Sequence, residues 1–454
     1  MFRQMTSVAI GCVGLAVAAM AADSAELRTL TPQARVARVA AAFPKVDAAP
    51  QLSTASASYV ELHQIEGGEA ALNGLSTMIV SDRLGRSEAP LREWVRRNSE
   101  TLSTLEKIAD APRWAYKVDT TAPTPTAATQ SLGAFEASSC RVLAMRANLA
   151  ANDGDWDAAY ADNIRLHRIA GHLLAQPSPF SQPIGRRVAR IALRQSLAFL
   201  SRKPPADPAA IAETLRAAWG MRPDAEAMDL VIAATELDFI EASYAWAKDP
   251  SRHGGHGFAL EAYLFDVSNE NAKPLPRPFR DVEELRAAMG KSSVEKSIAA
   301  ADAVRALLRA ARTSPIHESW RGVEALREQV AKASAADPLQ RVVHLMPDLD
   351  LFESAFIVAQ RAAVELVLAV RIYETKEKSP PADAAVLAPG TIPALPIDPF
   401  SGKPLVYEKA GKGFRIYSIG PDGKDDGGKD GEWRRAPGDF VFWPPNASGL
   451  TQIE

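Results

Sequence analysis

A loop near the C-terminus holds the densest group of potential metal ligands in the chain. Residues 420–431 contain five glycines and four aspartates, which favour neither a stable helix nor a buried core. Calcium would order such a loop, because it binds about six to eight oxygens from carboxylates and from carbonyls exposed at glycine turns. The pattern is not an EF-hand, since no glutamate closes it at the twelfth position, and a flexible acidic turn explains the composition equally well. The candidate side-chain ligands are Asp422, Asp425, Asp426 and Asp430.

Histidines offer a second possible metal site. His253 and His256 flank two glycines and could bind zinc, but no third ligand lies nearby, so a polar surface loop is the favoured interpretation. His167 and His172 are five residues apart, whereas two metal ligands on one helix face are spaced by four. We therefore predict that these two histidines are structural or exposed.

Acid–base chemistry has one group of candidates, the carboxylates of Glu236, Asp238 and Glu241 in a single predicted helix. They could act as general acid and base if they lay buried beside a cleft, although a charged helix face accounts for them more simply. The sequence has no Gly-x-Ser-x-Gly elbow, phosphate-binding loop, dinucleotide fingerprint or His-Glu-x-x-His motif. We therefore expect a protein that is not an enzyme and keep a hydrolase as the alternative.

One predicted helix, residues 183–202, carries a basic face. Three of its arginines are spaced by four residues and so lie along one side. A solvated face is the simpler interpretation, and a surface for an anionic partner is the alternative. The helix carries Arg186, Arg187, Arg190 and Arg194.

The composition favours a large helical protein. At 454 residues the chain is too long for one core, and its 47% apolar and 24% charged residues are ordinary for a folded protein. Abundant alanine and few aromatic residues favour helices over sheets. The net charge of −3 gives no electrostatic reason to expect a nucleic-acid partner.

The first 21 residues are predicted to be a secretory signal. Arg3 supplies the positive charge, residues 8–18 form an apolar run, and residues 19–21 make a small-x-small cleavage site. The run is short for a bilayer of about 30 Å, which favours cleavage over an uncleaved anchor. Lipidation of Cys12 is a further alternative. Cleavage leaves Cys140, which shares a helix face with small and apolar residues and is predicted to be a buried structural thiol.

Periodic apolar positions predict a helical domain at residues 26–345, with possible sub-boundaries at the segments 119–130 and 269–280. One part of it resembles a tetratricopeptide-type helix pair, in which Gly154 permits the chain reversal and Asp155 caps the second helix. The predicted helices are 31–43, one after Pro90, 134–151, 156–174, 183–202, 228–247, 282–289 and 294–312.

A long alanine- and valine-rich helix at residues 351–377 precedes a sharp change of composition. Beyond it, prolines, glycines and aromatic residues replace alanine, and short strands are predicted at 405–407 and 414–417. The predicted fold class is therefore mainly α, with a small C-terminal α+β module at residues 351–450.

Three motifs of this module resemble, in the same order, the C-terminal module of the major pseudopilin of type II secretion. They are Asp-Pro-Phe-Ser-Gly-Lys-Pro-Leu-Val-Tyr at 398–407, Tyr-Ser-Ile-Gly-Pro-Asp-Gly at 417–423 and Asp-Phe-Val-Phe-Trp at 439–443. The resemblance implies a long helix packed on a small antiparallel sheet, with calcium bound in the loop. It further implies the Asp422 side chain and the Ile419 carbonyl as ligands, with a second carboxylate from Asp425, Asp426 or Asp430.

The resemblance covers the C-terminal quarter of the chain. Ser401 is an extra residue in the first motif, and the long helix is internal, whereas pseudopilins begin with theirs. The resemblance therefore does not extend to assembly of a fibre. The whole layout is similar to uncharacterised exported helical proteins of planctomycete-type bacteria, which implies export and no particular activity.

These observations together predict an exported, periplasmic or extracellular, non-catalytic scaffold or interaction protein. Its C-terminal module would be stabilised by calcium and its partner would be a protein. Contact with a membrane is expected only through the signal segment, if that segment stays uncleaved. A secreted or periplasmic hydrolase with its active site in the helical domain is the alternative.

Overall fold

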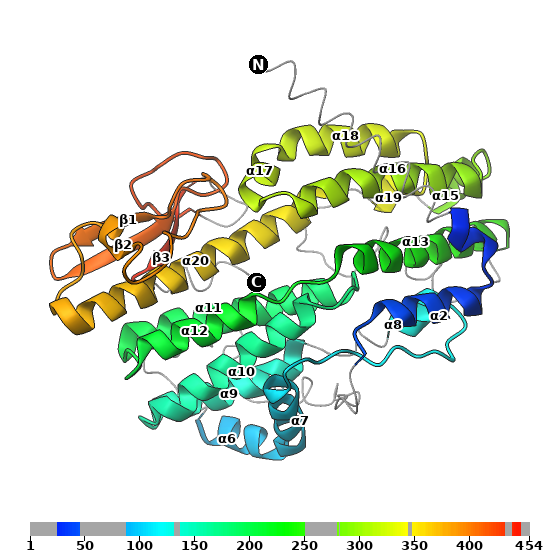
Figure 1. Ribbon diagram of the computed structural model, residues 1–454. Coiled ribbons are helices and arrows are strands. Elements are labelled where there is room, and N and C mark those ends of the chain that lie inside the picture. Colours follow the sequence, from blue (N-terminus) through cyan, green and yellow to red (C-terminus); the bar gives the residue numbers. More distant parts are fainter. Residues whose placement is uncertain are drawn as a thin grey trace.

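The computed structural model confirms a mainly helical protein with a small antiparallel sheet at its C-terminal end (Figure 1). It describes residues 25–45, 88–130, 137–249, 279–280, 282–343, 347–431 and 438–445. The predicted signal at 1–21, the pair His253 and His256, and most of the segment 269–280 lie outside these ranges. Within them, no helix combines the length and the hydropathy needed to cross a membrane.

The elements follow the chain in four groups. The first includes α2 (Pro32–Ala42), α6 (Glu88–Arg97), α7 (Ser99–Asp110) and α8 (Pro125–Gln130). The central group is α9 (Ala137–Asn152), α10 (Trp156–Leu174), α11 (Ser181–Arg202) and α12 (Pro208–Trp219). The third includes α13 (Ala225–Lys248), α15 (Val282–Met289), α16 (Val294–Thr313), α17 (Ile316–Arg321), α18 (Val323–Ala335) and α19 (Gln340–Val343). The C-terminal group is α20 (Pro347–Glu377), η3 (Ala384–Leu387), β1 (Val406–Ala410), β2 (Gly413–Ser418) and β3 (Phe440–Trp443).

Local sequence signals act at the ends of α2 and at the hairpin of α9 and α10, as predicted. Thr31 caps α2 by accepting a hydrogen bond from the Ala34 N–H, and Pro32 occupies the first turn. In the hairpin of α9 and α10, Gly154 has φ of +83°, and the Asp155 carboxylate accepts from the Ala158 N–H at 3.1 Å. Both predicted roles in the hairpin are confirmed.

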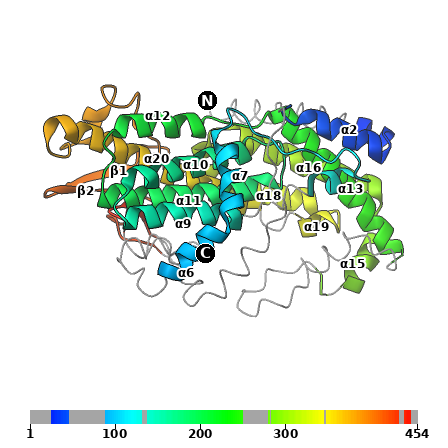
Figure 2. The ribbon, with the colours of Figure 1, turned by 90° about the horizontal axis from the view of Figure 1, so that it is seen from below.

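Helix α11 lies between two hydrophobic cores. Val188 and Ala192 pack into a core that it shares with α9, α10, α13 and α16. Leu193, Leu197 and Leu200 pack into a second core, built from α12, α20 and the sheet. The second core therefore joins residues of the predicted helical domain to the C-terminal module. Figures 1 and 2 show the sheet at one end of the molecule and α2 with α15 at the other, and in Figure 1 helix α20 runs from the sheet toward the middle.

The sheet has the order β1-β2-β3, and both strand pairs are antiparallel. Helix α20 packs against β2 and β3 through aromatic contacts, such as Phe356 against Phe440, whose ring centroids are 5.1 Å apart. Near the other end of the helix, the Arg371 guanidinium lies over the ring of Trp443. Stacked and edge-to-face rings stabilise an interface by more than their buried area alone would, so the helix and the sheet form one packed unit.

Two segments differ from the sequence-based expectation. The segment 119–130, predicted as a linker from its composition, contains α8, and Ala128 and Thr129 are fully buried. Small residues there pack against α2 and α13, a contact that composition does not reveal. The helix predicted after Pro90 is two helices, α6 and α7, that meet at Asn98, whose side-chain amide donates to the Trp94 carbonyl at 2.8 Å.

The prediction of a buried structural thiol is confirmed. Cys140 on α9 is fully buried in the first core, and burial raises the pKa of its thiol. A neutral thiol in an apolar setting packs as a small hydrophobic side chain.

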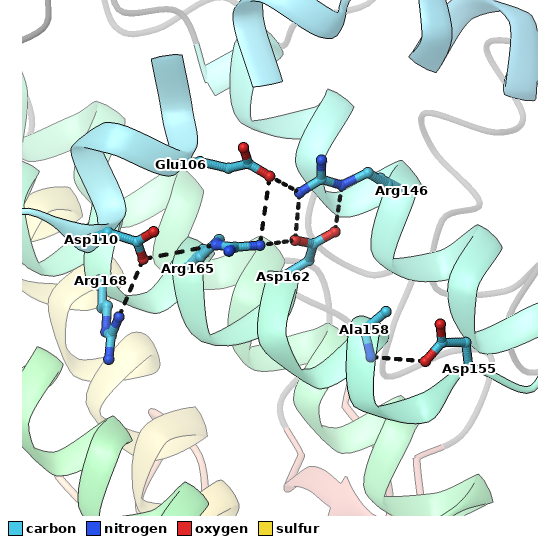
Figure 3. Close-up of polar contacts among 8 residues, drawn as sticks. All are labelled: Glu106, Asp110, Arg146, Asp155, Ala158, Asp162, Arg165 and Arg168. Atoms are coloured by element: carbon cyan, nitrogen blue, oxygen red, sulfur yellow. Dashed lines mark hydrogen bonds and ion pairs between the residues drawn. The ribbon is translucent and has the colours of Figure 1, made fainter. Parts of the chain in front are cut away.

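A network of ion pairs holds α7, α9 and α10 together (Figure 3). At its centre is Asp162, whose side chain is 5% exposed. Its carboxylate accepts two hydrogen bonds of 2.7 Å from Arg146 and one of 2.9 Å from Arg165. Arg146 also donates to Glu106 of α7 at 2.7 Å. The buried carboxylate therefore fixes two cations, and through them three helices.

Asp162→Ala is expected to lower the free energy of unfolding by about 2 kcal/mol, because it leaves two partly buried guanidiniums without their shared carboxylate. The matched control is Asp155→Ala, which removes a helix cap on the same helix and should cost about 1 kcal/mol. Urea unfolding followed by circular dichroism measures both. A smaller effect of Asp162→Ala than of Asp155→Ala would contradict the role given to this network.

Candidate functional site

The first two C-terminal motifs are joined by a buried carboxylate. Asp398 is 1% exposed, and its Oδ1 accepts from the Ser418 hydroxyl at 2.9 Å and from the Phe400 N–H at 3.0 Å. The Ser418 hydroxyl oxygen in turn accepts from the Gly420 N–H at 3.1 Å. Burial raises the pKa of Asp398, and these donors oppose that shift. The turn of the first motif is thereby tied to the end of β2, where the acidic loop begins.

A second buried carboxylate, Asp439, organises the acidic loop itself. Asp439 is fully buried, and its carboxylate accepts from the Asp426 N–H at 3.3 Å and from the Gly428 N–H at 2.6 Å. Its own N–H donates to the Lys429 carbonyl at 2.9 Å. Asp439 belongs to the third motif, but this role was not predicted from the sequence. The sequence signal that could have indicated this role is the position of Asp439 directly before β3, the strand that follows the loop.

The predicted metal ligands lie on the outer side of this loop. Asp422, Asp425 and Asp426 are exposed, while Asp430 and Ile419 are half-buried. The Asp422 carboxylate accepts from the Lys424 N–H at 3.1 Å, which closes a local turn. The Asp425 carboxylate accepts from the Tyr417 hydroxyl at 3.2 Å and from the Gly427 N–H at 3.0 Å.

Among the predicted ligands, Asp425 and Asp426 lie near enough to the Asp439 carboxylate for their charges to act on it. Burial raises the pKa of Asp439, and the charges of Asp425 and Asp426 raise it further. In the described part of the chain, no group of three His, Cys, Asp or Glu side chains is arranged to hold a metal ion.

The three carboxylates of α13 predicted as acid–base candidates do not point to one place. Glu236 pairs with Arg305 of α16 at 3.5 Å, Asp238 accepts from a backbone N–H of α8 at 3.3 Å, and Glu241 accepts from Arg35 of α2 at 2.7 Å. Burial raises the pKa of Glu236 to about 7, against the opposing charge of Arg305. These three side chains therefore hold α13 to three neighbouring helices.

A chain of buried hydrogen bonds links the four central helices. In order from donor to acceptor it runs through Trp219, His167, Ser196, Asn163, Gln195 and Asn148. Trp219 Nε1 donates to His167 Nδ1 at 3.1 Å, and His167 Nε2 lies 2.9 Å from the Ser196 hydroxyl. The Ser196 hydroxyl donates to Asn163 Oδ1 at 2.7 Å, and Asn163 Nδ2 donates to Gln195 Oε1 at 3.1 Å. Gln195 Nε2 then donates to Asn148 Oδ1 at 2.7 Å.

The direction of these hydrogen bonds fixes the protonation state of the His167 ring. Because the indole N–H of Trp219 can only donate, His167 Nδ1 must accept, and the ring proton lies on Nε2. Burial lowers the pKa of His167 to about 3, so the ring is neutral at pH 7. Although the distance to Ser196 would suit a base and a nucleophile, a protonated Nε2 cannot accept the hydroxyl proton. The pair is structural, as the sequence predicted for His167, and His172 is also buried.

Trp219, at the end of this chain, lines a cavity of about 900 Å³ between α10, α11, α16 and α20. Its wall carries five arginines and two carboxylates, those of Asp229 and Glu365. Leu174, Met221 and Ile357 contribute to its apolar surface. The arginines are Arg186, Arg222, Arg309, Arg312 and Arg361.

A second cavity, of about 980 Å³, shares Ala218, Met221, Arg222 and Pro223 with the first. Its charged side chains balance, because three arginines face three carboxylates. They are Arg113, Arg168, Arg222, Asp110, Glu213 and Asp224. The predicted catalytic candidates Glu236 and Asp238 line neither cavity.

Comparison with known proteins gives no assignment: no family model matches the sequence, and no match is found among curated proteins or among solved structures.

The close contact of α10 and α12 depends on Gly171. A Cβ at this position would overlap the backbone carbonyl oxygen of Ala218. Gly171→Ala is expected to push α12 away from α10, weaken the bond from Trp219 to His167, and lower the free energy of unfolding by about 1–3 kcal/mol. Gly390→Ala is the matched control and should be nearly neutral, because its Cβ would meet nothing within 4 Å. Thermal unfolding of both variants tests this, and equal midpoints would contradict it.

Proposed function

We propose that this protein is an exported, non-catalytic interaction protein whose C-terminal module is stabilised by calcium. The observation that carries the proposal is the buried carboxylate of Asp439, on which the charges of Asp425 and Asp426 act. Asp439 is buried beneath the acidic loop, while Asp425 and Asp426 face solvent close to it. Like charges held this close oppose one another, and a divalent cation would offset that repulsion.

The surrounding module supports a stabilising role for the ion. Asp398 and Asp439 fix the two ends of the loop to β2 and β3, and the sheet is fixed to α20 by aromatic packing. The loop is thus a small surface element on a rigid base. Calcium bound by its carbonyls and by Asp422, Asp425 or Asp426 would order the loop without reshaping the module.

The proposal of a protein partner rests on the architecture. A helical body with two cores, fixed to a small sheet, offers extended helix faces on which another chain can dock. The proposal of export to the periplasm or the outside rests on residues 1–21, which lie outside the described ranges.

One observation favours the alternative, a hydrolase. The pKa of Glu236, raised by burial to about 7, is suited to general acid–base catalysis near neutral pH. Such a site needs a second group within reach of the same substrate. Because Asp238 and Glu241 contact other helices, the geometry of α13 supports the non-catalytic proposal better.

Excess calcium is expected to raise the unfolding midpoint relative to excess chelator, since a ligand that binds only the folded state stabilises it by about 2.7 kcal/mol at 100 times its Kd. Hydrogen exchange across 420–431 should slow at the same time, and magnesium should have a smaller effect. Asp425→Ala and Asp422→Ala should each reduce the calcium response.

The matched control is Asp383→Ala, which removes the cap of η3 in the same module but lies outside the loop. It should lower the midpoint while the calcium response stays intact. If the wild-type protein unfolds identically in calcium and in chelator, the loop is a flexible acidic turn and the calcium proposal is wrong.

A further inference from the structure

The geometry points to the arginine-lined cavity as a binding site for a small amphipathic anion, a molecule with a carboxylate or phosphate group on an apolar body. This inference goes beyond the proposed function and does not depend on calcium. It rests on an excess of cationic side chains, on two guanidiniums with no carboxylate within ion-pair distance among the described residues, and on an apolar wall beside them.

The charge in the cavity opposes that of the whole chain. The chain has a net charge of −3, yet the cavity wall has five arginines against two carboxylates. Arg309 and Arg312 share one carboxylate, Asp229, at 2.8 and 3.5 Å. Glu365, the other, is paired with Arg216 at 3.4 Å. The carboxylates of the wall are therefore already engaged.

Arg222 and Arg361 are the two cations available to a ligand. Within the described residues, neither guanidinium lies within ion-pair distance of a carboxylate. Each instead donates to the Trp219 carbonyl, Arg222 at 2.7 Å and Arg361 at 3.2 Å. Burial and the charge of Arg222 lower the pKa of Arg361, and the charge of Glu365, which is paired with Arg216, opposes this shift. A bound anion would relieve the repulsion between the two cations and could accept from both planar forks.

The wall beside these arginines is suited to an apolar group. The Arg361 guanidinium lies 4.9 Å from the centre of the Trp219 ring, and Met221 and Ile357 line the same space. Ile397, which is 43% exposed, also lines the cavity. The volume of about 900 Å³ lies within the range usual for small-molecule sites, which are mostly apolar with a few fixed polar groups.

The position of the site is set by the buried hydrogen-bond chain. Trp219 ends α12, donates to His167, and accepts on its carbonyl from both Arg222 and Arg361. The two arginines come from different elements, the turn after α12 and α20. The rest of the cavity wall includes residues of both cores, such as Ala170 and Ala189 of the first and Leu193 of the second.

Isothermal titration calorimetry on the whole folded protein tests the inference with four probes. Decanoate and decyl phosphate both carry the proposed anionic group and apolar body, and at least one should bind. Decanol, which lacks the charge, and inorganic phosphate, which lacks the apolar body, should each bind at least about tenfold more weakly. Affinity should fall as salt is raised from about 0.1 M to about 1 M, where the Debye length shrinks from about 10 Å to about 3 Å.

Two variants locate the site. Arg222→Gln and Arg361→Gln should each weaken binding about tenfold or more, because a charged hydrogen bond is lost. Arg361→Lys keeps the charge without the fork and should weaken binding less than Arg361→Gln. The matched control is Arg187→Gln, an exposed arginine of α11 that does not line the cavity, and it should bind as the wild type does.

Three results would overturn the inference: no binding of either anionic probe, binding of decanol as tight as that of decanoate, or equal affinities for Arg222→Gln and Arg187→Gln. Arg222 is exposed, so its variant is expected to fold, and its circular dichroism spectrum checks this.

Discussion

The buried hydrogen-bond chain from Trp219 to Asn148 is the constraint on which the arrangement of the central helices depends. It crosses α9, α10, α11 and α12, and each link joins side chains that are at most about a tenth exposed. A polar group left unpaired in such a place costs about 1–3 kcal/mol, so the chain is stable only when every donor meets its acceptor. That requirement admits one relative placement of the four helices and one protonation state of His167.

Other features follow from that placement. Helix α11 is held between the two cores, so the C-terminal module packs on the helical body through α12 and α20. Trp219 is held at the end of α12, where its carbonyl receives Arg222 and Arg361 and where the arginine-lined cavity lies. The acidic loop is governed by a different pair of groups, Asp398 and Asp439. The two candidate sites are therefore built by separate sets of buried polar residues.

Local signals in the sequence predicted the helical part well. Helix 282–289, the cap at Asp155 and the turn at Gly154 were predicted because propensity, capping and periodicity act over a few residues. Contacts between distant segments were not predictable in this way. Trp219 and His167 are 52 residues apart, and Arg222 meets Arg361 only in the folded chain. Likewise, the composition of the segment 119–130 favoured a linker, and its burial was not predictable because it depends on contact with the later helix α13.

The most direct test of this constraint is the protonation state of His167, measured by nitrogen-15 NMR of protein with labelled histidine side chains. Ser196→Ala, which should perturb the Nε2 signal, assigns the resonance. We predict a neutral ring with its proton on Nε2 from about pH 8 down to about pH 5, below the ordinary histidine pKa of about 6.5. A ring that titrates near its ordinary pKa, or a neutral ring with its proton on Nδ1, would contradict the buried chain as the basis of the fold.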